Sequence, residues 1–258
     1  MNLPAHQTKH LAELPYTLPD GTAVVLKQDC ETPDSTGRTV WLGAQVLAVY
    51  LSDFLGRNVQ RKKVIELGSG TGLLALSLFS QGYDVLATDL PLIVDGVLKE
   101  NLEGNSEAVG GGRYGDPRLE SKVLDWSEEP DKWSWDESAN PEKALKPPFD
   151  VIVTADTVYE PALSQPLLRS LHGLASLSPA ASIYVALEAR DPQLVADFLA
   201  SASSDWSFKT SRVDHGRLKR LVESKESTLD WEDETDWEGI EVWKCKLTRV
   251  RLKGKAKG

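Results

Sequence analysis

Apolar and polar positions follow two different periods along the chain, and each period predicts a different element. Short continuous apolar runs predict buried strands, and apolar side chains three or four positions apart predict helices. Strands are expected at 63–67, 84–88, 122–124, 149–155, 182–187, 206–213 and 240–247, and helices at 41–55, 73–79, 91–102, 163–174 and 192–199. Because strands alternate with helices, we expect an α/β fold with a mostly parallel sheet and helices on both faces.

The two ends of the chain depart from this alternation. Residues 14–29 alternate around Pro19-Asp20-Gly21, which predicts an N-terminal β-hairpin extension. The last two strands flank an acidic stretch, which predicts an antiparallel last strand. In the middle of the chain, the glycine-rich residues 104–115 predict a surface loop, and the acidic, tryptophan-bearing residues 125–148 predict a long insertion.

Composition and charge narrow the possible functions. The 258 residues include 39 acidic and 29 basic side chains, for a net charge of −10. This excess argues against a generally basic face, so no direct binding of nucleic acid is expected. The two cysteines and four histidines show no metal-ligand spacing, so no metal is expected. Because the N-terminus has no apolar signal core and no apolar run is long enough to span a membrane, we expect a cytoplasmic protein without membrane contact.

The most informative segment is Val64-Ile65-Glu66-Leu67-Gly68-Ser69-Gly70-Thr71-Gly72, which leads from a predicted strand through three alternating glycines into a helix. Glycines let the backbone turn sharply and let a ligand approach closely, and the helix N-terminus offers free N–H groups. A dinucleotide fingerprint would need glycine where Leu73 stands, and a phosphate loop would need a Gly-Lys-Ser/Thr sequence that is absent. The alternative is a glycine-rich turn that binds no ligand.

Acidic residues follow the next two predicted strands. Asp89 could accept hydrogen bonds from a ribose diol, or it could be the N-cap of a helix that begins near Pro91. Asp125 could accept a hydrogen bond from the amino group of adenine, and Trp126 could cover the face of that ring. The alternative for this pair is an ordinary strand end that leads into an acidic loop.

Two motifs resemble those of known families. The pattern E-x-G-x-G-x-G from Glu66 to Gly72 resembles motif I of the seven-strand, class I methyltransferases, which bind S-adenosylmethionine. The fourth strand is followed by Asp156-x-x-Tyr159, where the nucleic-acid amino methyltransferases of this class carry N/D-P-P-F/Y. This D-x-x-Y resembles the eukaryotic protein-lysine methyltransferases of methyltransferase family 16. The resemblance covers about residues 37–247 and includes Gly37-x-x-Val40-Trp41, Asp89-Leu90-Pro91, Asn101 and Asn105.

The resemblance implies a Rossmann-like seven-stranded methyltransferase sheet and S-adenosylmethionine as the cofactor. It implies these cofactor-binding residues: Trp41, Glu66, Gly68, Ser69, Gly70, Gly72, Asp89, Asp125, Trp126 and Ala155. The glycine turn would wrap the methionine moiety, with Glu66 near its amino group. Asp156 and Tyr159 would be catalytic, because Asp156 could hold an amine by a charged hydrogen bond and the Tyr159 ring could line a narrow channel. The alternative for this pair is a helix N-cap and a core aromatic residue before Pro161.

The domains expected on this basis are an N-terminal extension with the hairpin at 1–36, a methyltransferase domain at 37–248 and a basic tail at 249–258. The favoured function is S-adenosylmethionine-dependent methylation of a protein lysine. The chain most resembles fungal enzymes that act on translation elongation factor 1-alpha, so a protein substrate and a monomeric enzyme are expected. The alternatives are a small-molecule N- or O-methyltransferase and a non-catalytic interaction module that binds S-adenosylmethionine.

The acid excess is concentrated in two segments. Residues 125–142 hold seven acidic side chains and one basic, and residues 223–241 hold nine acidic and one basic. Each segment could recruit a basic protein substrate, or each could be a solvated loop, and for residues 223–241 the solvated loop is the favoured interpretation.

Overall fold

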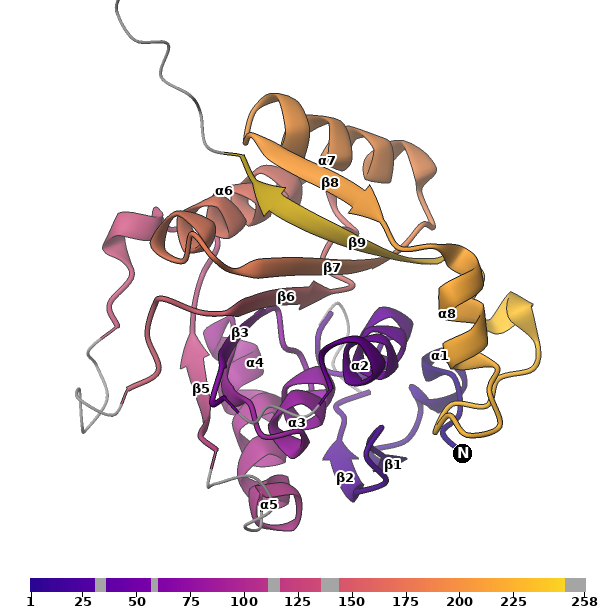
Figure 1. Cartoon of the computed structure of the whole chain (residues 1–258). Coiled ribbons are helices and arrows are strands. Elements are labelled where there is room, and N and C mark those ends of the chain that lie inside the picture. Colours follow the sequence, from indigo (N-terminus) through magenta and orange to yellow (C-terminus); the bar gives the residue numbers. More distant parts are fainter. Residues whose placement is uncertain (31–35, 57–59, 111–116, 136–143, 249–258) are drawn as a thin grey trace, which may run out of the picture.

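A seven-stranded sheet forms the centre of the computed structural model (Figure 1), which describes residues 1–30, 36–56, 60–110, 117–135 and 144–248. The strand order is β5-β4-β3-β6-β7-β9-β8. The strands are β3 (Lys63–Leu67), β4 (Asp84–Asp89), β5 (Leu119–Val123), β6 (Val151–Ala155), β7 (Ser182–Glu188), β8 (Phe208–Arg212) and β9 (Ile240–Leu247). Strand β9 runs antiparallel to both of its neighbours, and the other pairs are parallel. The predicted α/β sheet with an antiparallel last strand is confirmed.

Helices cover both faces of the sheet, as predicted. In Figure 1, α6 (Pro161–Leu177) and α7 (Pro192–Ser204) lie above the sheet, and α2 (Leu42–Leu55) and α3 (Leu73–Ser80) lie below it. Alternate residues of each central strand face these two layers. In β3, Val64 packs into the core that contains α2 and α3, and Ile65 packs into the core that contains α6 and α7.

The N-terminal hairpin consists of β1 (Glu13–Thr17) and β2 (Ala23–Lys27) and follows the short helix α1 (Ala5–Thr8). Its inward-facing leucines are buried in the core that contains α2 and α3. Two asparagines of α5 (Lys99–Gly110) hold β2 by bonding both backbone groups of Val25 and of Lys27. Asn101 and Asn105 reach the same strand because residues four apart lie on one face of a helix. The domain boundary at residues 36 and 37 remains a prediction.

The connection after β4 differs from its prediction. It consists of α4 (Pro91–Ile93), a π-helical turn η1 (Val94–Leu98) and then α5, which continues to Gly110. The surface loop predicted from Gly104 is therefore wrong over 104–110. Burial of Asn105 and Val109 against the hairpin and the core stabilises two helical turns that glycine content alone disfavours. Residues 111–116 of that predicted loop lie outside the described residues.

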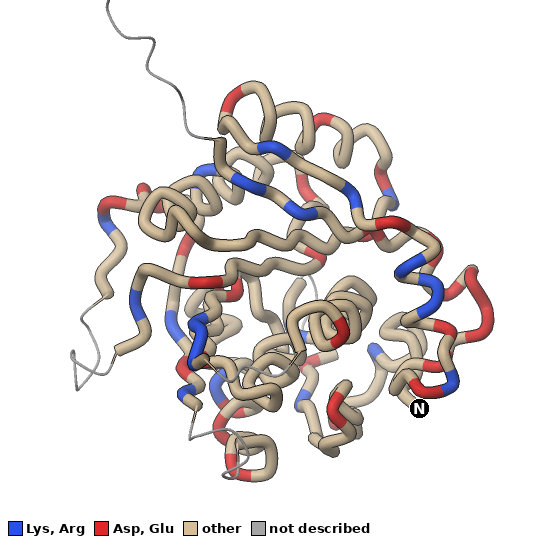
Figure 2. The backbone as a smooth tube through the Cα atoms, viewed as in Figure 1, with Lys and Arg blue, Asp and Glu red and all other residues tan. Residues whose placement is uncertain are grey.

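The acidic segments are more structured than solvated loops. Between β8 and β9 the chain forms α8 (His215–Val222) and the 3₁₀ turn η3 (Glu234–Asp236), and both Trp231 and Trp237 are buried. Figure 2 shows the acidic positions of this segment on the loop beyond α8, at the right of the view. The described part of the segment after β5 forms the 3₁₀ turn η2 (Pro130–Lys132) and buries Trp133 against the core; residues 136–143 lie outside the described part.

The strand order places a binding site in a predictable position. The order reverses between β3 and β6, and parallel sheets bind ligands outside the carboxyl ends of the strands at such a reversal. Among the described residues, no helix is long and apolar enough to cross a membrane.

Candidate functional site

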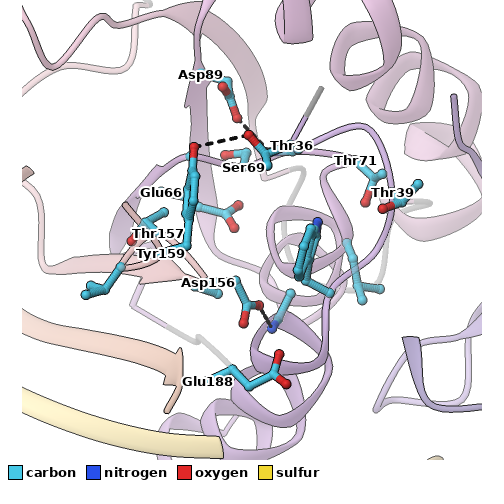
Figure 3. A pocket seen from close by; sticks show the side chains of 18 of the residues that line it. Thr36, Thr39, Glu66, Ser69, Thr71, Asp89, Asp156, Thr157, Tyr159 and Glu188 are labelled. Carbon is cyan, nitrogen blue, oxygen red and sulfur yellow. Dashed lines mark hydrogen bonds between the residues drawn. The ribbon is translucent and has the colours of Figure 1, made fainter. Parts of the chain in front are cut away.

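A cavity of about 390 Å³ opens at the carboxyl ends of β3, β4, β6 and β7 (Figure 3), where the strand order reverses. Most of the predicted site residues line it: Trp41, Glu66, Gly68, Ser69, Gly70, Asp89, Trp126, Ala155, Asp156 and Tyr159. Gly72 and Asp125 do not line it. The sheet therefore collects side chains from distant parts of the sequence around one space.

The glycine turn forms one wall of the cavity. Gly68 and Gly70 have φ angles of 68° and 53°, which side chains disfavour. A Cβ atom on Gly68 would lie 2.7 Å from the Thr157 side chain, and one on Gly70 would lie 2.8 Å from the backbone oxygen of Gly37. Gly72 has a structural role away from the cavity. It is the N-cap residue of α3 with φ 83°, and it packs against Leu102. The first two glycines keep a concave backbone surface open to the cavity.

Glu66 is the most unusual side chain in this wall. It is the residue before the last in β3 and is only 2% exposed. One of its carboxylate oxygens is buried without a hydrogen-bond partner among the described residues. Burial raises the pKa of Glu66 well above its usual value, and the nearby Asp89 carboxylate raises it further. A cationic donor in the cavity would satisfy this oxygen and stabilise the ionised carboxylate.

Asp89 supports the glycine turn from the end of β4. Its carboxylate accepts hydrogen bonds from the backbone N–H groups of Gly70 at 2.8 Å and Leu90 at 2.7 Å. Burial raises the pKa of Asp89. Leu90, not Asp89, occupies the N-cap position of α4. Each carboxylate oxygen can accept a second hydrogen bond, so Asp89 retains acceptor capacity toward the cavity.

Asp125 and Trp126, which follow β5 by two and three residues, lie in different places relative to the cavity. Trp126 lines the cavity beside Gly68, and its indole N–H is buried without a partner among the described residues. Asp125 instead accepts a hydrogen bond of 2.7 Å from the backbone N–H of Ser127, which forms a local turn. The structure thus brings Trp126, and not Asp125, to the cavity wall, and the predicted adenine contact of Asp125 stays a prediction.

Asp156 lines the cavity between Glu66 and Glu188 (Figure 3) and joins two elements. It follows β6 with a positive φ of 57°, and its two oxygens accept from the backbone N–H groups of Gly43 at 3.2 Å and Ala44 at 3.0 Å. These bonds cap the N-terminus of α2 from another part of the chain. Burial raises the pKa of Asp156 to about 7, although the Ala44 N–H group opposes this. Asp156 can therefore change its protonation near neutral pH.

Tyr159 lies at the mouth of the cavity and is 50% exposed. Its hydroxyl lies 3.1 Å from the Thr36 hydroxyl, so the two side chains form a hydrogen-bonded bridge (Figure 3). Trp41 lines the same cavity from the start of α2. An aromatic ring on each of two elements suits the passage of an alkyl ammonium chain, because ring faces attract cations.

Sequence reasoning did not identify the lining residues at the end of β7 and directly after it. Glu188, Arg190, Asp191 and Leu194 all line the cavity. The available signal was the charged group Glu188-Ala189-Arg190-Asp191 directly after a predicted parallel strand, the position at which ligands bind in such sheets. The end of β7 is therefore one of the strand ends that form the site.

The cavity fits S-adenosylmethionine. The partnerless oxygen of Glu66 suits its ammonium group, and Gly68 lines the cavity with no room for a Cβ atom beside Thr157. The acceptor capacity of Asp89 suits a ribose diol, and the Trp126 ring suits an adenine face. In Figure 3, Asp89 and Glu188 lie at opposite ends of the site, with Glu66 and Asp156 between them. One end thus suits the cofactor and the other is left for an acceptor.

Fold and site together define a class I S-adenosylmethionine-dependent methyltransferase. The sequence profile of the lysine methyltransferase family matches residues 20–205. The chain belongs to this family.

Relatives support the same assignment. The chain is 26% identical over 236 residues to the protein N-terminal and lysine N-methyltransferase EFM7 of Yarrowia lipolytica, with 88% of this chain and 84% of that protein covered. It is 34% identical over 142 residues to the protein-lysine methyltransferase METTL21E of Bos taurus, with 55% and 43% covered. It is 33% identical over 153 residues to the EEF1A lysine methyltransferase 3 of Mus musculus, with 58% and 55% covered. The matches thus span about half the length of the two mammalian proteins.

Solved structures share the fold. A protein of Streptococcus mutans described as a SAM-dependent methyltransferase superposes with a TM-score of 0.53 at 12% identity, with 92% of this chain and 56% of that chain covered. The structure of SMU.776, a methyltransferase complexed with SAH, gives a TM-score of 0.54 at 12% identity and the same coverage. At this identity the likeness concerns the fold alone.

Proposed function

We propose that this chain transfers a methyl group from S-adenosylmethionine to the side-chain amine of a lysine in a protein, and that the protein is translation elongation factor 1-alpha. The observation that carries the proposal is that Asp156 and Tyr159 line the same cavity as the residues that fit the cofactor, with Asp156 between Glu66 and Glu188. The chain resembles fungal enzymes that act on this factor, and one mammalian relative is named for EEF1A. A cytoplasmic location follows from that substrate.

When bound, the cofactor supplies an activated methyl group on a positively charged sulfur. The chain's part is to hold and orient it: Glu66 at the ammonium, the Gly68–Gly72 turn around the methionine chain, and Asp89 at the ribose. A closed, pre-formed wall of this kind favours transfer because much of the barrier lies in aligning the reacting atoms.

The acceptor amine must lose its proton before it can attack. A lysine ammonium has a pKa of about 10.4 in water and no free electron pair until it is deprotonated. Near Asp156, whose carboxyl has a pKa of about 7, the amine can be held by a charged hydrogen bond to a carboxylate oxygen. The ammonium proton would pass to the Asp156 carboxylate or to water, and Asp156 would then hold the nitrogen with its electron pair toward the methyl group that the bound cofactor would supply. Tyr159 and Trp41 would enclose the alkyl chain and exclude water.

The test is methyl transfer into protein. Purified enzyme and radiolabelled S-adenosylmethionine are added to a lysate of cells from which the chain's own gene has been deleted, and labelled proteins are identified by mass spectrometry. We expect label on a lysine of elongation factor 1-alpha and none with the Glu66→Gln variant. Label confined to metabolites would favour a small-molecule methyltransferase. Cofactor binding without any label would favour a non-catalytic module.

The same experiment identifies the acceptor amine. Because one relative is named for N-terminal as well as lysine methylation, peptide mapping must distinguish a lysine side chain from an α-amine. Label on an N-terminal residue alone would contradict the lysine assignment.

A further inference from the structure

Glu188 is a second carboxylate at the acceptor end of the cavity. It is the last residue of β7, and β7 lies beside β6 in parallel register, with Ala155 opposite Ala186. The backbone N–H of Asp156 donates to the Ala186 carbonyl at 2.9 Å, which ties the two strand ends together. Figure 3 shows Glu188 beyond Asp156, on the side away from Asp89. Glu188 thus lies farther from the cofactor end than Asp156 does.

The partners of the two carboxylates differ in kind. Both oxygens of Asp156 accept from backbone groups of α2, and a Cβ atom on Gly43 would lie only 2.6 Å from one of them. These bonds fix the orientation of Asp156. The partner of Glu188 is the guanidinium of Arg190, whose side chain is 56% exposed. An exposed guanidinium can be exchanged for another cation at little cost, because water solvates it after it leaves.

Trp41 completes the surroundings of Glu188 as a cation-binding wall. The Lys9 ammonium lies 3.4 Å from the centre of the Trp41 ring, and the Arg190 guanidinium carbon lies 5.0 Å from it. Two cations of this chain therefore already lie against the ring, as expected for the electron-rich face of an indole. The carboxylate of Glu188 and the ring of Trp41 both line the cavity, and the Arg190 guanidinium contacts both of them.

We propose that Glu188 and Trp41 form the subsite that receives the acceptor ammonium, and that Arg190 is a placeholder that the incoming ammonium displaces from Glu188. The proposal rests on the proposed function, since it assigns the group that lysine contacts on entry. Asp156 then acts at the next position inward, where its orientation is fixed by α2. The substrate class selected by this subsite is an unbranched primary alkyl ammonium.

Lys9 shows how this environment acts on an ammonium group. Burial lowers the pKa of Lys9, and the positive charge of Arg190 lowers it further, against the opposite effect of Glu188. An acceptor lysine that enters against the same ring experiences the same burial. The subsite would therefore attract the ammonium through Glu188 and also ease the loss of its proton.

The experiment uses a small probe, so it depends neither on the identity of the protein substrate nor on turnover. Binding of n-butylammonium chloride to the full chain saturated with S-adenosylhomocysteine is measured by saturation-transfer NMR, with n-butanol as the neutral control. We expect Glu188→Gln to weaken ammonium binding by about fivefold or more, which corresponds to the loss of one charge-assisted hydrogen bond. Arg190→Gln should strengthen it, because the placeholder is gone. The control Glu160→Gln, which removes an exposed carboxylate next to Tyr159, should leave binding unchanged.

The outcomes separate the subsite from the proposed function. The subsite is overturned by any of three results, even if lysate proteins are methylated. These are unchanged ammonium binding in Glu188→Gln, weaker binding in Arg190→Gln, and a loss in Glu160→Gln equal to that in Glu188→Gln. Binding of S-adenosylhomocysteine by each variant shows whether that variant is folded. If Glu188→Gln no longer binds S-adenosylhomocysteine, the test is Arg190→Gln alone, which should bind the ammonium more strongly than wild type. With the identified substrate, Glu188→Gln should raise KM by about tenfold while Arg190→Gln lowers it, and equal losses of kcat in both would contradict the proposal.

Discussion

Three acidic side chains of the cavity share one electrostatic property. Glu66, Asp89 and Asp156 each have a raised pKa, and burial is the largest cause in each. A buried carboxylate without a cation is costly, and the same carboxylate gains when a cation binds beside it. The cofactor brings an ammonium and a sulfonium, and the acceptor lysine brings another ammonium. The site is therefore arranged for cationic ligands before any of them binds.

The glycine turn offers a direct test at this scale. In Gly68→Ala the new methyl would meet Thr157 at 2.7 Å in a backbone conformation with positive φ, so we expect S-adenosylhomocysteine to bind about tenfold more weakly or worse. Calorimetric titration measures this. The matched control is Gly104→Ala, where no atom lies within 4 Å of the new Cβ and the residue is in α5. It should bind normally and gain about 0.5–1 kcal/mol of stability.

Asp156 predicts a pH dependence of stability. Its pKa is about 7 in the folded protein and near 3.8 in the unfolded chain, so between these values the folded state holds the extra proton. The contribution of this group to stability is thus greatest at low pH and falls as pH rises from about 4 to about 7. Asp156→Asn removes that fall. From pH 5 to pH 8, its unfolding free energy should improve relative to wild type by roughly 2–3 kcal/mol.

Denaturant unfolding at several pH values measures this difference. A constant offset between Asp156→Asn and wild type reports the lost α2 cap, and only the change with pH reports the titration. The exposed Glu160→Gln serves as the control with no expected slope. An offset that does not vary between pH 5 and pH 8 would contradict the raised pKa.

At the scale of elements, single side chains tie α2 and α5 to distant parts of the chain. Trp41 at the N-cap of α2 makes no side-chain cap, and the carboxylate of Asp156 supplies it. Asn101 of α5 accepts a hydrogen bond from the Lys27 N–H and donates to the Lys27 carbonyl. It also donates to the Thr71 carbonyl. The hairpin, the glycine turn and α5 therefore meet at one amide side chain.

Asn101→Ala should loosen this junction. The side chain is 2% exposed, and its loss removes a partner from the part-buried backbone of Lys27 and from the buried carbonyl of Thr71. We expect a loss of about 2–3 kcal/mol of stability and a Tm lower by several degrees. Hydrogen exchange should show faster exchange of the Lys27 amide. The exposed Glu107→Ala on the same helix should change neither quantity, and normal Lys27 protection in Asn101→Ala would show that the hairpin docks by other contacts.

At the scale of the whole molecule, the acidic segment between β8 and β9 ties the N-terminal end of the chain to the central sheet. The Trp231 indole donates to the Asn2 carbonyl at 2.7 Å, and the Asn2 N–H donates to the Thr228 carbonyl at 2.8 Å. The Ala189 N–H donates to the Gly239 carbonyl, which places the end of this segment beside Glu188. Several of its acids are already paired, as Glu234 is with Lys219 and His215. Recruitment of a basic substrate by this segment stays a prediction.

Trp231→Ala distinguishes a packed segment from a solvated loop. The Trp231 side chain is 4% exposed, so its removal should cost about 3–5 kcal/mol through the cavity and the lost hydrogen bond. Thermal unfolding measures the loss, and proteolysis near residue 2 should become faster. The exposed neighbour Glu232→Ala should stay within about 0.5 kcal/mol of wild type. A near-neutral Trp231→Ala would return the segment to the status of a solvated loop.

The sequence by itself determined the alternation of strands and helices, the hairpin, the glycine turn and the resemblance carried by Asp156 and Tyr159, because each depends on residues close together along the chain. The folded structure was needed to show that Asp156 caps α2 across 113 residues, that Asp125 bonds Ser127 and does not line the cavity, and that α5 continues through Gly104. It alone brought Glu188 and Arg190 beside Trp41. These features depend on which surfaces pack together, and no local pattern of residue types encodes the neighbours that packing supplies.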